Sequence, residues 1–458
     1  MPPPSGPGGV DHGVRLRLAA LSVRREALHG PQEPCRHRKA RNSVTVALHP
    51  FESRAPRIGS VKPFDGIRGV GVWCVVLQHA YAVADSLSGY IDLFFVLSGF
   101  LITTLIFEER RATGAMSLRN FYARRGIRLL PGLIVTLIVF FLPILAIRIA
   151  NPNPDTEFLF TNVVWESIAT LFYVHNIFFS PLLGSFQYMG QMWSLSLEEQ
   201  FYLVGALATY WCLKRNWIRQ LAVALVVFIL VVWVARGMGL GGPGQFWFQR
   251  PDAIAMGVLL AIIHAVAPTE LSATAKRRLH AVAWVATGGM IFALLSSSKL
   301  VERLGGFYVP LYPTDVDIEA PPKGLTPPQL KEYADNAIQV VLAELPNGNY
   351  WVRWGFTLST ICAAVLVFAF VRLRDEFALS RWLSLRLLCY FGALSYAIYI
   401  THYQLFQLMT PGFSGGPKWI PIKLLAAYLV GAALHRFVER PALKRYRHRF
   451  VHATASTR

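Results

Sequence analysis

The sequence has 458 residues, of which 54% are hydrophobic and only 16% are charged, whereas an average soluble domain carries about 25% charged residues. Its 45 lysines and arginines outnumber its 26 acidic residues, which gives a formal net charge of +19. This composition excludes a disordered chain and a disulfide-rich secreted scaffold. The basic residues stand between long apolar runs, so they indicate a polytopic membrane protein and no nucleic-acid partner. No two of the five cysteines have CxxC spacing, so we expect no metal site.

The chain opens with a polar segment and continues with apolar ones. Residues 1–63 are rich in proline, glycine and arginine and contain no apolar run long enough to cross a bilayer, so we expect a disordered basic tail. A membrane-spanning helix needs about 20 mostly apolar residues. We therefore predict an all-α polytopic membrane protein, a ten-span helical bundle. The candidate spans are 64–84, 90–107, 131–149, 193–213, 220–236, 252–267, 281–298, 354–371, 388–408 and 420–436.

The basic residues also orient these spans, because short loops rich in lysine and arginine stay in the cytoplasm. Six connecting or terminal segments hold 34 of the 45 basic residues, and with ten spans all six fall on one side. We therefore predict a multi-pass protein of the cell inner (plasma) membrane with both termini cytoplasmic, including a basic tail at 442–458. An eleventh apolar stretch, 164–180, would invert the later spans if it crossed, so we predict that it is re-entrant or lies on the outer side.

The longest connection is the loop 299–353, which the same count places outside the cytoplasm. Four prolines interrupt its middle. Residues 328–345 alternate apolar and polar side chains at helical spacing, so we expect a short amphipathic helix there. The bundle proper is then the membrane domain 64–441, with this loop inserted into it.

Ionisable residues inside spans are costly and are treated as functional candidates. Arg68 and His79 lie 11 residues apart in the first span, close to three helical turns, so they share a face about 16 Å apart along the axis. We expect Arg68 at the cytoplasmic mouth and His79 near mid-membrane. This arrangement suits a long ligand with an anionic head, and a buried neutral histidine can act as a general base. The alternative is a snorkelling arginine and a histidine that serves packing.

Two further charged groups stand in other segments. In 121–131 (FYARRGIRLLP), Arg125 and Arg128 are three apart, share a helical face and could bind phosphate, or could be ordinary positive-inside charge. In 192–203 (MWSLSLEEQFYL), Glu198 and Glu199 stand at the predicted outer end of the fourth span. Adjacent helical side chains diverge by about 100°, so only one is expected to face the interior. The carboxylate that faces the interior could support a histidine or bind an acceptor hydroxyl. The alternative is that the glutamates lie at a hydrated helix N-terminus, where the helix dipole favours acidic residues.

A last group of polar residues lies near predicted outer span ends or within apolar stretches. Together these residues could line an outward-facing substrate-binding cavity, although each alone could be structural. They are Asp92, His175, Asn176, Arg250, Asp252 and His402.

These segments together resemble the acyltransferase 3 family of membrane O-acyltransferases. The resemblance runs in order through PFDGIRGVGVWCVVLQHA (63–80), GYIDLFFVLSGFLIT (89–103), FYARRGIRLLP (121–131), MWSLSLEEQFYL (192–203), RPDAIAMGVLLA (250–261), SYAIYITHYQLF (395–406) and VERP (438–441). It includes an Arg-ten residues-His spacing at Arg68 and His79, an Arg-x-x-Arg at Arg125 and Arg128, and a carboxylate at Glu198. Some members carry a C-terminal hydrolase-like domain, which we do not expect here because only 17 residues follow VERP.

The resemblance implies transfer of an acyl group, often acetyl, from cytoplasmic acyl-CoA to a hydroxyl of a carbohydrate, cell-envelope glycan, glycolipid or glycosylated natural product. We expect the donor's phosphates on Arg68, Arg125 and Arg128 and its thioester near His79. His79 would serve as a base or a covalent acyl carrier, with Glu198 supporting it or the acceptor. Two alternatives stay open: a proton-coupled transporter or flippase of a lipid-linked sugar, and an acyltransferase that modifies a macrolide-type antibiotic at the cytoplasmic face.

Overall fold

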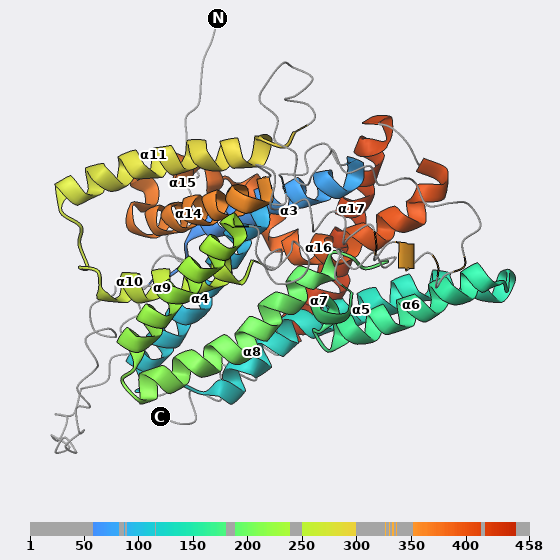
Figure 1. Cartoon of the computed structure of the whole chain (residues 1–458), viewed down its shortest axis with the longest axis horizontal. Coiled ribbons are helices and arrows are strands. Elements are labelled where there is room, and N and C mark those ends of the chain that lie inside the picture. The colour runs from blue at the N-terminus through green and yellow to red at the C-terminus, as the bar shows by residue number, and fades with distance from the viewer. Residues whose placement is uncertain are drawn as a thin grey trace, which may run out of the picture. The chain divides into compact units, whose positions relative to one another are not determined.

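The computed structural model describes most of the membrane domain. The described residues are 58–81, 87, 89–114, 116–179, 188–238, 250–298, 326, 329, 332–333, 336, 351–413 and 417–445. Every regular element among them is a helix (Figure 1). The predicted all-α class is therefore confirmed for this part of the chain.

Each of the ten predicted spans coincides with a helix. These helices are α3 (Lys62–Tyr81), α4 (Tyr90–Thr113), α5 (Leu118–Ala150), α8 (Met192–Lys214), α9 (Ile218–Gly237), α10 (Pro251–Val266), α11 (Ala273–Leu295), α14 (Trp351–Arg372), α16 (Arg386–Phe413) and α17 (Ile420–Leu434). The shorter elements are α6 (Pro154–Leu171), α7 (His175–Phe178), α15 (Ala378–Leu383), the 3₁₀ turns Arg374–Glu376 and Pro417–Trp419, and a π-helical stretch His435–Glu439 that continues α17.

The predicted count of ten spans is not confirmed. Among the described residues, six helices are long and apolar enough to cross a membrane: α4, α5, α9, α11, α14 and the continuous helix Ile420–Arg445. Helix α10 is apolar but has only 16 residues. Helices α3, α8 and α16 carry charged residues, histidines, glutamines and tyrosines that lower their hydropathy. Length and composition thus support a membrane protein with several apolar helices.

Close backbone contacts join the helices that carry the candidate residues. Helix α3 packs on α16, and α4 packs on α10. A Cβ atom on Gly69 of α3 would lie 2.2 Å from the carbonyl oxygen of Leu388 in α16, and one on Gly392 would lie 1.9 Å from that of Asp65. Only glycine permits this approach, as is common where helices pack in membranes. The contact holds α3 and α16 in a fixed register.

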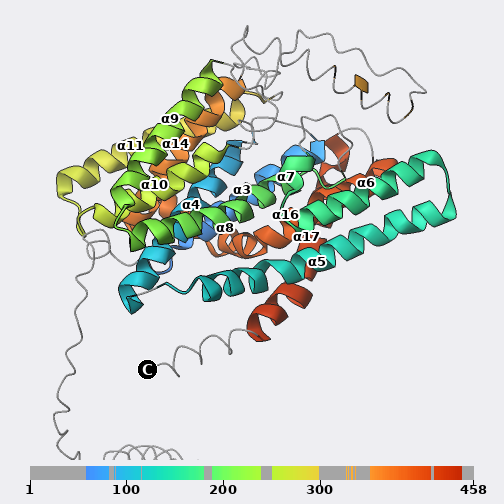
Figure 2. The ribbon, with the colours of Figure 1, turned by 60° about the horizontal axis from the view of Figure 1, so that its bottom comes forward.

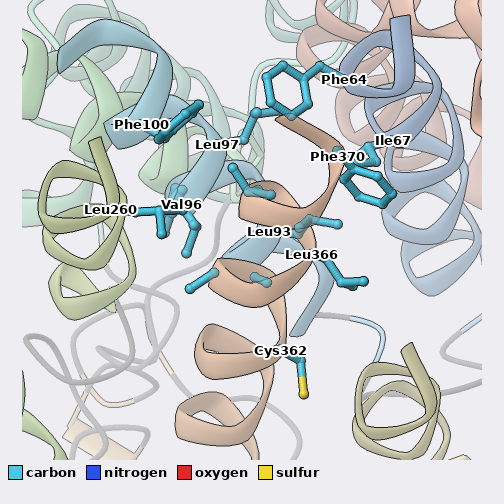
Figure 3. Close-up of a cluster of buried hydrophobic side chains, with 14 of the residues drawn as sticks. Phe64, Ile67, Leu93, Val96, Leu97, Phe100, Leu260, Cys362, Leu366 and Phe370 are labelled. Carbon is cyan, nitrogen blue, oxygen red and sulfur yellow. The ribbon is translucent and has the colours of Figure 1, made fainter. Parts of the chain in front are cut away.

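A buried hydrophobic cluster fills the space between α3, α4, α10 and α14 (Figure 3). Phe64 and Ile67 from α3 lie near Leu97 and Phe100 of α4, and Phe370 of α14 closes the group. All five side chains are less than 4% exposed. This core fixes the first half of α3, from which Arg68 projects.

The segment 164–180 is not a single helix. Helix α6 runs back along α5 (Figures 1 and 2), where Arg148 pairs with Glu157 at 2.6 Å. It ends at Leu171, Tyr173 takes a left-handed φ of 56°, and α7 then packs on α8. The position of this segment relative to the bilayer stays a prediction.

Three further predictions fall mainly beyond the described residues. Of the loop 299–353, only residues 326, 329, 332–333, 336 and the start of α14 are described, and 329, 332–333 and 336 are helical. The helix predicted over 328–345 otherwise lies outside the described part. So do nearly all of the tail 1–63, although α3 already begins at Lys62, and residues 446–458 of the second tail.

Candidate active site

A histidine pair lies where α3 meets α16. The Nδ1 atom of His79 lies 2.8 Å from the Nε2 atom of His402, and the two rings are stacked at 19° with centroids 5.1 Å apart. His79 is half-buried, whereas His402 is fully buried. The ring of Tyr403 meets His79 edge-on at 5.1 Å. The sequence predicts both histidines as site residues, but it gives no sign that they touch across 323 positions.

The second ring nitrogen of His402 is held by the backbone of its own helix. Its Nδ1 atom lies 2.8 Å from the carbonyl oxygen of Tyr399 and 3.2 Å from that of Ile398. The hydroxyl of Tyr399 donates to the carbonyl of Gln191 at 2.7 Å and is also hydrogen-bonded to the hydroxyl of Ser194. These bonds tie α16 to the start of α8 directly beside the histidine pair.

The predicted cationic group is assembled from α3 and α5. Arg68 lies 3.5 Å from Asp65, and its guanidinium also interacts electrostatically with Arg128 and Glu198. Arg125 is bound more firmly: it donates to Glu199 at 2.9 Å, and its guanidinium stacks 3.2 Å from the centre of the Tyr202 ring. Arg128 is exposed and forms no ion pair with another described residue. The three arginines therefore differ in how available they are to a ligand.

Both glutamates of α8 have partners inside the bundle, so the expectation that only one faces the interior was wrong. Glu198 accepts a hydrogen bond of 2.6 Å from Ser98 of α4, while Glu199 turns to Arg125 of α5. The two partners stand on different helices, so adjacent side chains of α8 can diverge and each still find a partner. The Arg125–Glu199 contact also places these residues at one level of the bundle. The glutamates therefore cannot stand at the outer end while 121–131 is a cytoplasmic segment.

Within the described residues, Glu198 contacts Ser98 and not a histidine. The group that supports His79 is instead His402. Glu198 lies near Arg68 and Arg125, which makes it a neighbour of the cationic group.

A second cluster of buried charges joins α4, α9, α10 and α14. Arg250 lies 3.4 Å from Asp92, which also accepts a hydrogen bond from Ser359. Arg236 pairs with Asp252 at 2.6 Å. The indole of Trp233 donates to the other oxygen of Asp252 at 2.9 Å, and Arg236 donates to Thr357 at 3.2 Å. Asp92 and Arg250 thus pair with each other, whereas Asp252 pairs with Arg236 and Trp233 of α9.

His175 belongs to a third group. Its Nε2 atom lies 3.6 Å from Glu166, and both residues are fully buried. Glu166 accepts the backbone N–H groups of Tyr188 and Met189 at 2.9 and 2.6 Å. Neither ring nitrogen of His175 has a hydrogen-bond partner in the described part of the chain. Asn176 exchanges amide hydrogen bonds with Gln200 of α8 at 2.8 and 3.1 Å.

The six polar residues predicted as one cavity lining therefore fall into three contact groups. The first is the buried charge cluster, in which Asp92 pairs with Arg250 and Asp252 pairs with Arg236. The second is His175 and Asn176, beside Glu166 and Gln200, and the third is His402 beside His79. Sequence reasoning missed Glu166 and Arg236, although each is a single charge within or at the end of an apolar run and the same cost argument would have found them. The described residues contain no group of three or more histidines, cysteines and carboxylates that could hold a metal ion.

The fold and the site together define a polytopic helical membrane protein with a histidine pair where two helices meet and Arg68 about three turns from His79 along α3. The family model for the acyltransferase 3 family, described as an acyltransferase domain, matches residues 62–436. The chain belongs to this family, and the resemblance seen in the sequence is confirmed.

Curated relatives agree with this assignment. The chain is 26% identical over 402 residues to a putative peptidoglycan O-acetyltransferase of Bacillus subtilis, covering 82% of this chain and 54% of that protein. It is 24% identical over 404 residues to a peptidoglycan O-acetyltransferase of Listeria monocytogenes, covering 84% and 56%. A putative O-acetyltransferase of Staphylococcus aureus is 34% identical over 147 residues, 30% of this chain and 23% of the relative. The chain thus spans about half the length of the first two relatives. No solved structure matches it.

Proposed function

We propose that this chain transfers an acyl group, most simply acetyl, from cytoplasmic acyl-CoA to a hydroxyl of a cell-envelope glycan at the inner (plasma) membrane. The family membership supports acyl transfer, and two of the relatives named above are described as acting on peptidoglycan. A sugar hydroxyl of a peptidoglycan-like glycan is therefore the first acceptor to test. Both termini are cytoplasmic in this proposal, which leaves the acceptor to enter from the opposite side.

The observation that carries the proposal is the state of His79. Its Nδ1 atom is engaged by His402, and the ring is half-buried, so Nε2 is the nitrogen left to meet a substrate. In the proposed reaction Nε2 takes the acceptor's hydroxyl proton while the oxygen attacks the thioester carbonyl. The C–S bond breaks, the C–O ester bond forms, and the proton passes from His79 to the leaving thiolate. The products are the O-acyl glycan and free coenzyme A.

The donor would bind along the face of α3. Arg68 lies about 16 Å from His79 by helical rise, which leaves room for an extended arm between a phosphate group and a thioester. Arg128 and Arg68 are the stronger phosphate candidates, because Arg125 is already neutralised by Glu199 and stacked on Tyr202. Glu198 is assigned to holding Arg68 and Arg125 in position.

The remaining candidates divide by their contacts. Asp92, Arg250 and Asp252 are assigned to joining helices, because their charges are matched within the protein. His175 is assigned to the acceptor, because its ring nitrogens make no hydrogen bond within the described part of the chain.

The test is transfer of a radiolabelled acetyl group from acetyl-CoA to envelope glycan by membranes that contain the full chain. His79→Ala should lower transfer by about 10²–10⁴-fold, the usual contribution of a general base. Arg128→Ala should raise the KM for acetyl-CoA several-fold. Arg124→Ala is the matched control for Arg128→Ala. Arg124 belongs to the same helix α5, but it already pairs with Glu109 at 2.8 Å, so its loss should leave this KM unchanged. Full activity of His79→Ala would refute the role of His79 as the base. A chain without substitutions that transfers no label to glycan would refute the proposed function.

A further inference from the structure

The histidine pair forms a directed chain of hydrogen bonds that begins at a backbone carbonyl. The carbonyl oxygen of Tyr399 lies 2.8 Å from Nδ1 of His402, and Nε2 of His402 lies 2.8 Å from Nδ1 of His79. A carbonyl oxygen can only accept a hydrogen bond. The Nδ1 atom of His402 must therefore carry a hydrogen.

The state of His402 then decides the state of His79. A neutral imidazole has one donor nitrogen and one acceptor nitrogen, so Nε2 of neutral His402 is an acceptor and Nδ1 of His79 must be the donor. The remaining nitrogen of His79, Nε2, then carries a lone pair. A charged His402 would donate through Nε2 and force the hydrogen of His79 onto its outer nitrogen.

The surroundings of His402 favour the neutral form. It is fully buried, and its hydrogen-bond and ring partners in the described part of the chain are two carbonyls, His79 and the rings of Tyr399, Tyr403 and Phe406. No carboxylate among the described residues contacts it. An unpaired charge is expensive to bury, so the ring stays neutral and acts as an acceptor.

We propose that His402 is a positioning residue that fixes His79 in the tautomer with Nε2 free to accept a proton. This inference rests on the proposed function, in which His79 is the base. When Nε2 of His79 takes the hydroxyl proton, the Nδ1–H group of the resulting imidazolium donates a stronger, charge-assisted hydrogen bond to His402. His402 itself gains and loses no proton. The logic is that of a base held by a third group, with an imidazole in the orienting position.

The packing around the pair keeps this geometry. His402 is held by carbonyls of its own helix, its ring meets Phe406 edge-on at 5.8 Å, and the glycine contacts between α3 and α16 fix the distance to His79. The amino group of Lys423 on α17 donates to the carbonyl of Ala80 at 3.2 Å, which anchors the next residue of α3. The pair is therefore set by three helices.

Two substitutions of His402 separate orientation from packing. Glutamine offers an amide oxygen that can accept the Nδ1–H group of His79, whereas methionine fills similar volume with only a weak acceptor. We expect H402Q to keep kcat for acetyl transfer within about tenfold of the unchanged chain. We expect H402M to lower kcat by about 10²-fold or more, the scale of a lost general base, with the KM for acetyl-CoA unchanged.

A third variant ties the effect to His79. If His402 acts only through His79, adding H402M to H79A lowers the residual transfer no further, because residues that act as a unit are non-additive. Thermal unfolding in detergent checks that all variants fold. The inference would be overturned if kcat fell equally in H402Q and H402M, or if kcat did not change in H402M. It would also be overturned if the losses of transfer in H79A and H402M multiplied in the double variant.

A spectroscopic measurement keeps this inference separate from the proposed function. The chain has 12 histidines, and ¹⁵N labelling of histidine with the H79A variant identifies the His79 signals. We expect Nδ1 of His79 to be protonated in the full chain and the signal to redistribute between tautomers in H402M. A protonated Nε2 in the unchanged chain would overturn the inference whether or not acetyl transfer is observed.

Discussion

The ion pair between α9 and α10 predicts a large and specific loss of stability. Arg236 and Asp252 lie 2.6 Å apart, with side chains 1% and 0% exposed. Changing Asp252→Ala leaves the guanidinium buried without its partner, for which about 3–5 kcal/mol of unfolding free energy is typical. The indole N–H of Trp233 loses its acceptor in the same variant, so the upper part of that range is expected.

Removing both charges should cost less than removing one. In the double variant Arg236→Met with Asp252→Leu, no charge is left unmatched, and apolar replacements of buried pairs are often neutral or stabilising. Only the Trp233 N–H stays without its acceptor, which costs about 1–3 kcal/mol. The double variant should therefore be more stable than Asp252→Ala by about 2 kcal/mol, the difference between those two ranges.

The assay is unfolding of the full chain in detergent, followed by tryptophan fluorescence, together with acetyl transfer by the same preparations. Arg148→Ala is the control, because its pair with Glu157 is exposed at 38% and 55% and such pairs contribute about 1 kcal/mol or less. A double variant that is as unstable as Asp252→Ala would refute the reasoning. A stable double variant that has lost transfer would instead return Asp252 to the substrate-binding role predicted from the sequence.

Two further predictions concern packing and backbone support. Gly69→Val should push α3 away from α16, lower the free energy of unfolding by about 1–3 kcal/mol and lower acetyl transfer. Gly288→Val is the control and should change neither, because an added Cβ at Gly288 would meet no described atom within 4 Å. Equal melting temperatures of the two variants would argue against the contact. Glu166→Gln keeps only one acceptor oxygen for the two backbone N–H groups of Tyr188 and Met189. Hydrogen exchange of one of these two amides should therefore become faster. Unchanged protection of both amides would contradict the assignment.

The helices could be predicted from sequence because apolar length is a local property. All ten predicted spans coincide with helices, including α10 with its 16 residues. The boundaries differ where polar residues continue a helix: α5 begins at Leu118, although its apolar run begins at position 131. Ser117 caps the amide of Asn120 and lets the helix start in the polar segment, which carries Arg125 and Arg128 into the bundle.

The candidate site could be predicted residue by residue but not contact by contact. The cost of intramembrane charge identifies His79, His402, Asp92 and Asp252 from the sequence alone. Which of them pair depends on helix packing, and that is set by glycine contacts between segments more than 300 positions apart. The contact of Glu199 with Arg125 likewise depends on how α8 lies relative to α5, which the sequence of neither helix reveals.

The distribution of polarity among the helices explains why the span count and the site are linked. The apolar windows of α9 and α11 are only 17% and 22% buried inside the protein, which is the property of helices that face lipid. The helices α3, α8 and α16 are more polar, and they hold Arg68, His79, Glu198 and His402. A charged or hydrogen-bonding side chain in a bilayer must face protein. The polar side chains of α3, α8 and α16 are therefore expected on the faces of these helices that pack on other helices, and a search for the chemistry of this chain should begin with those faces.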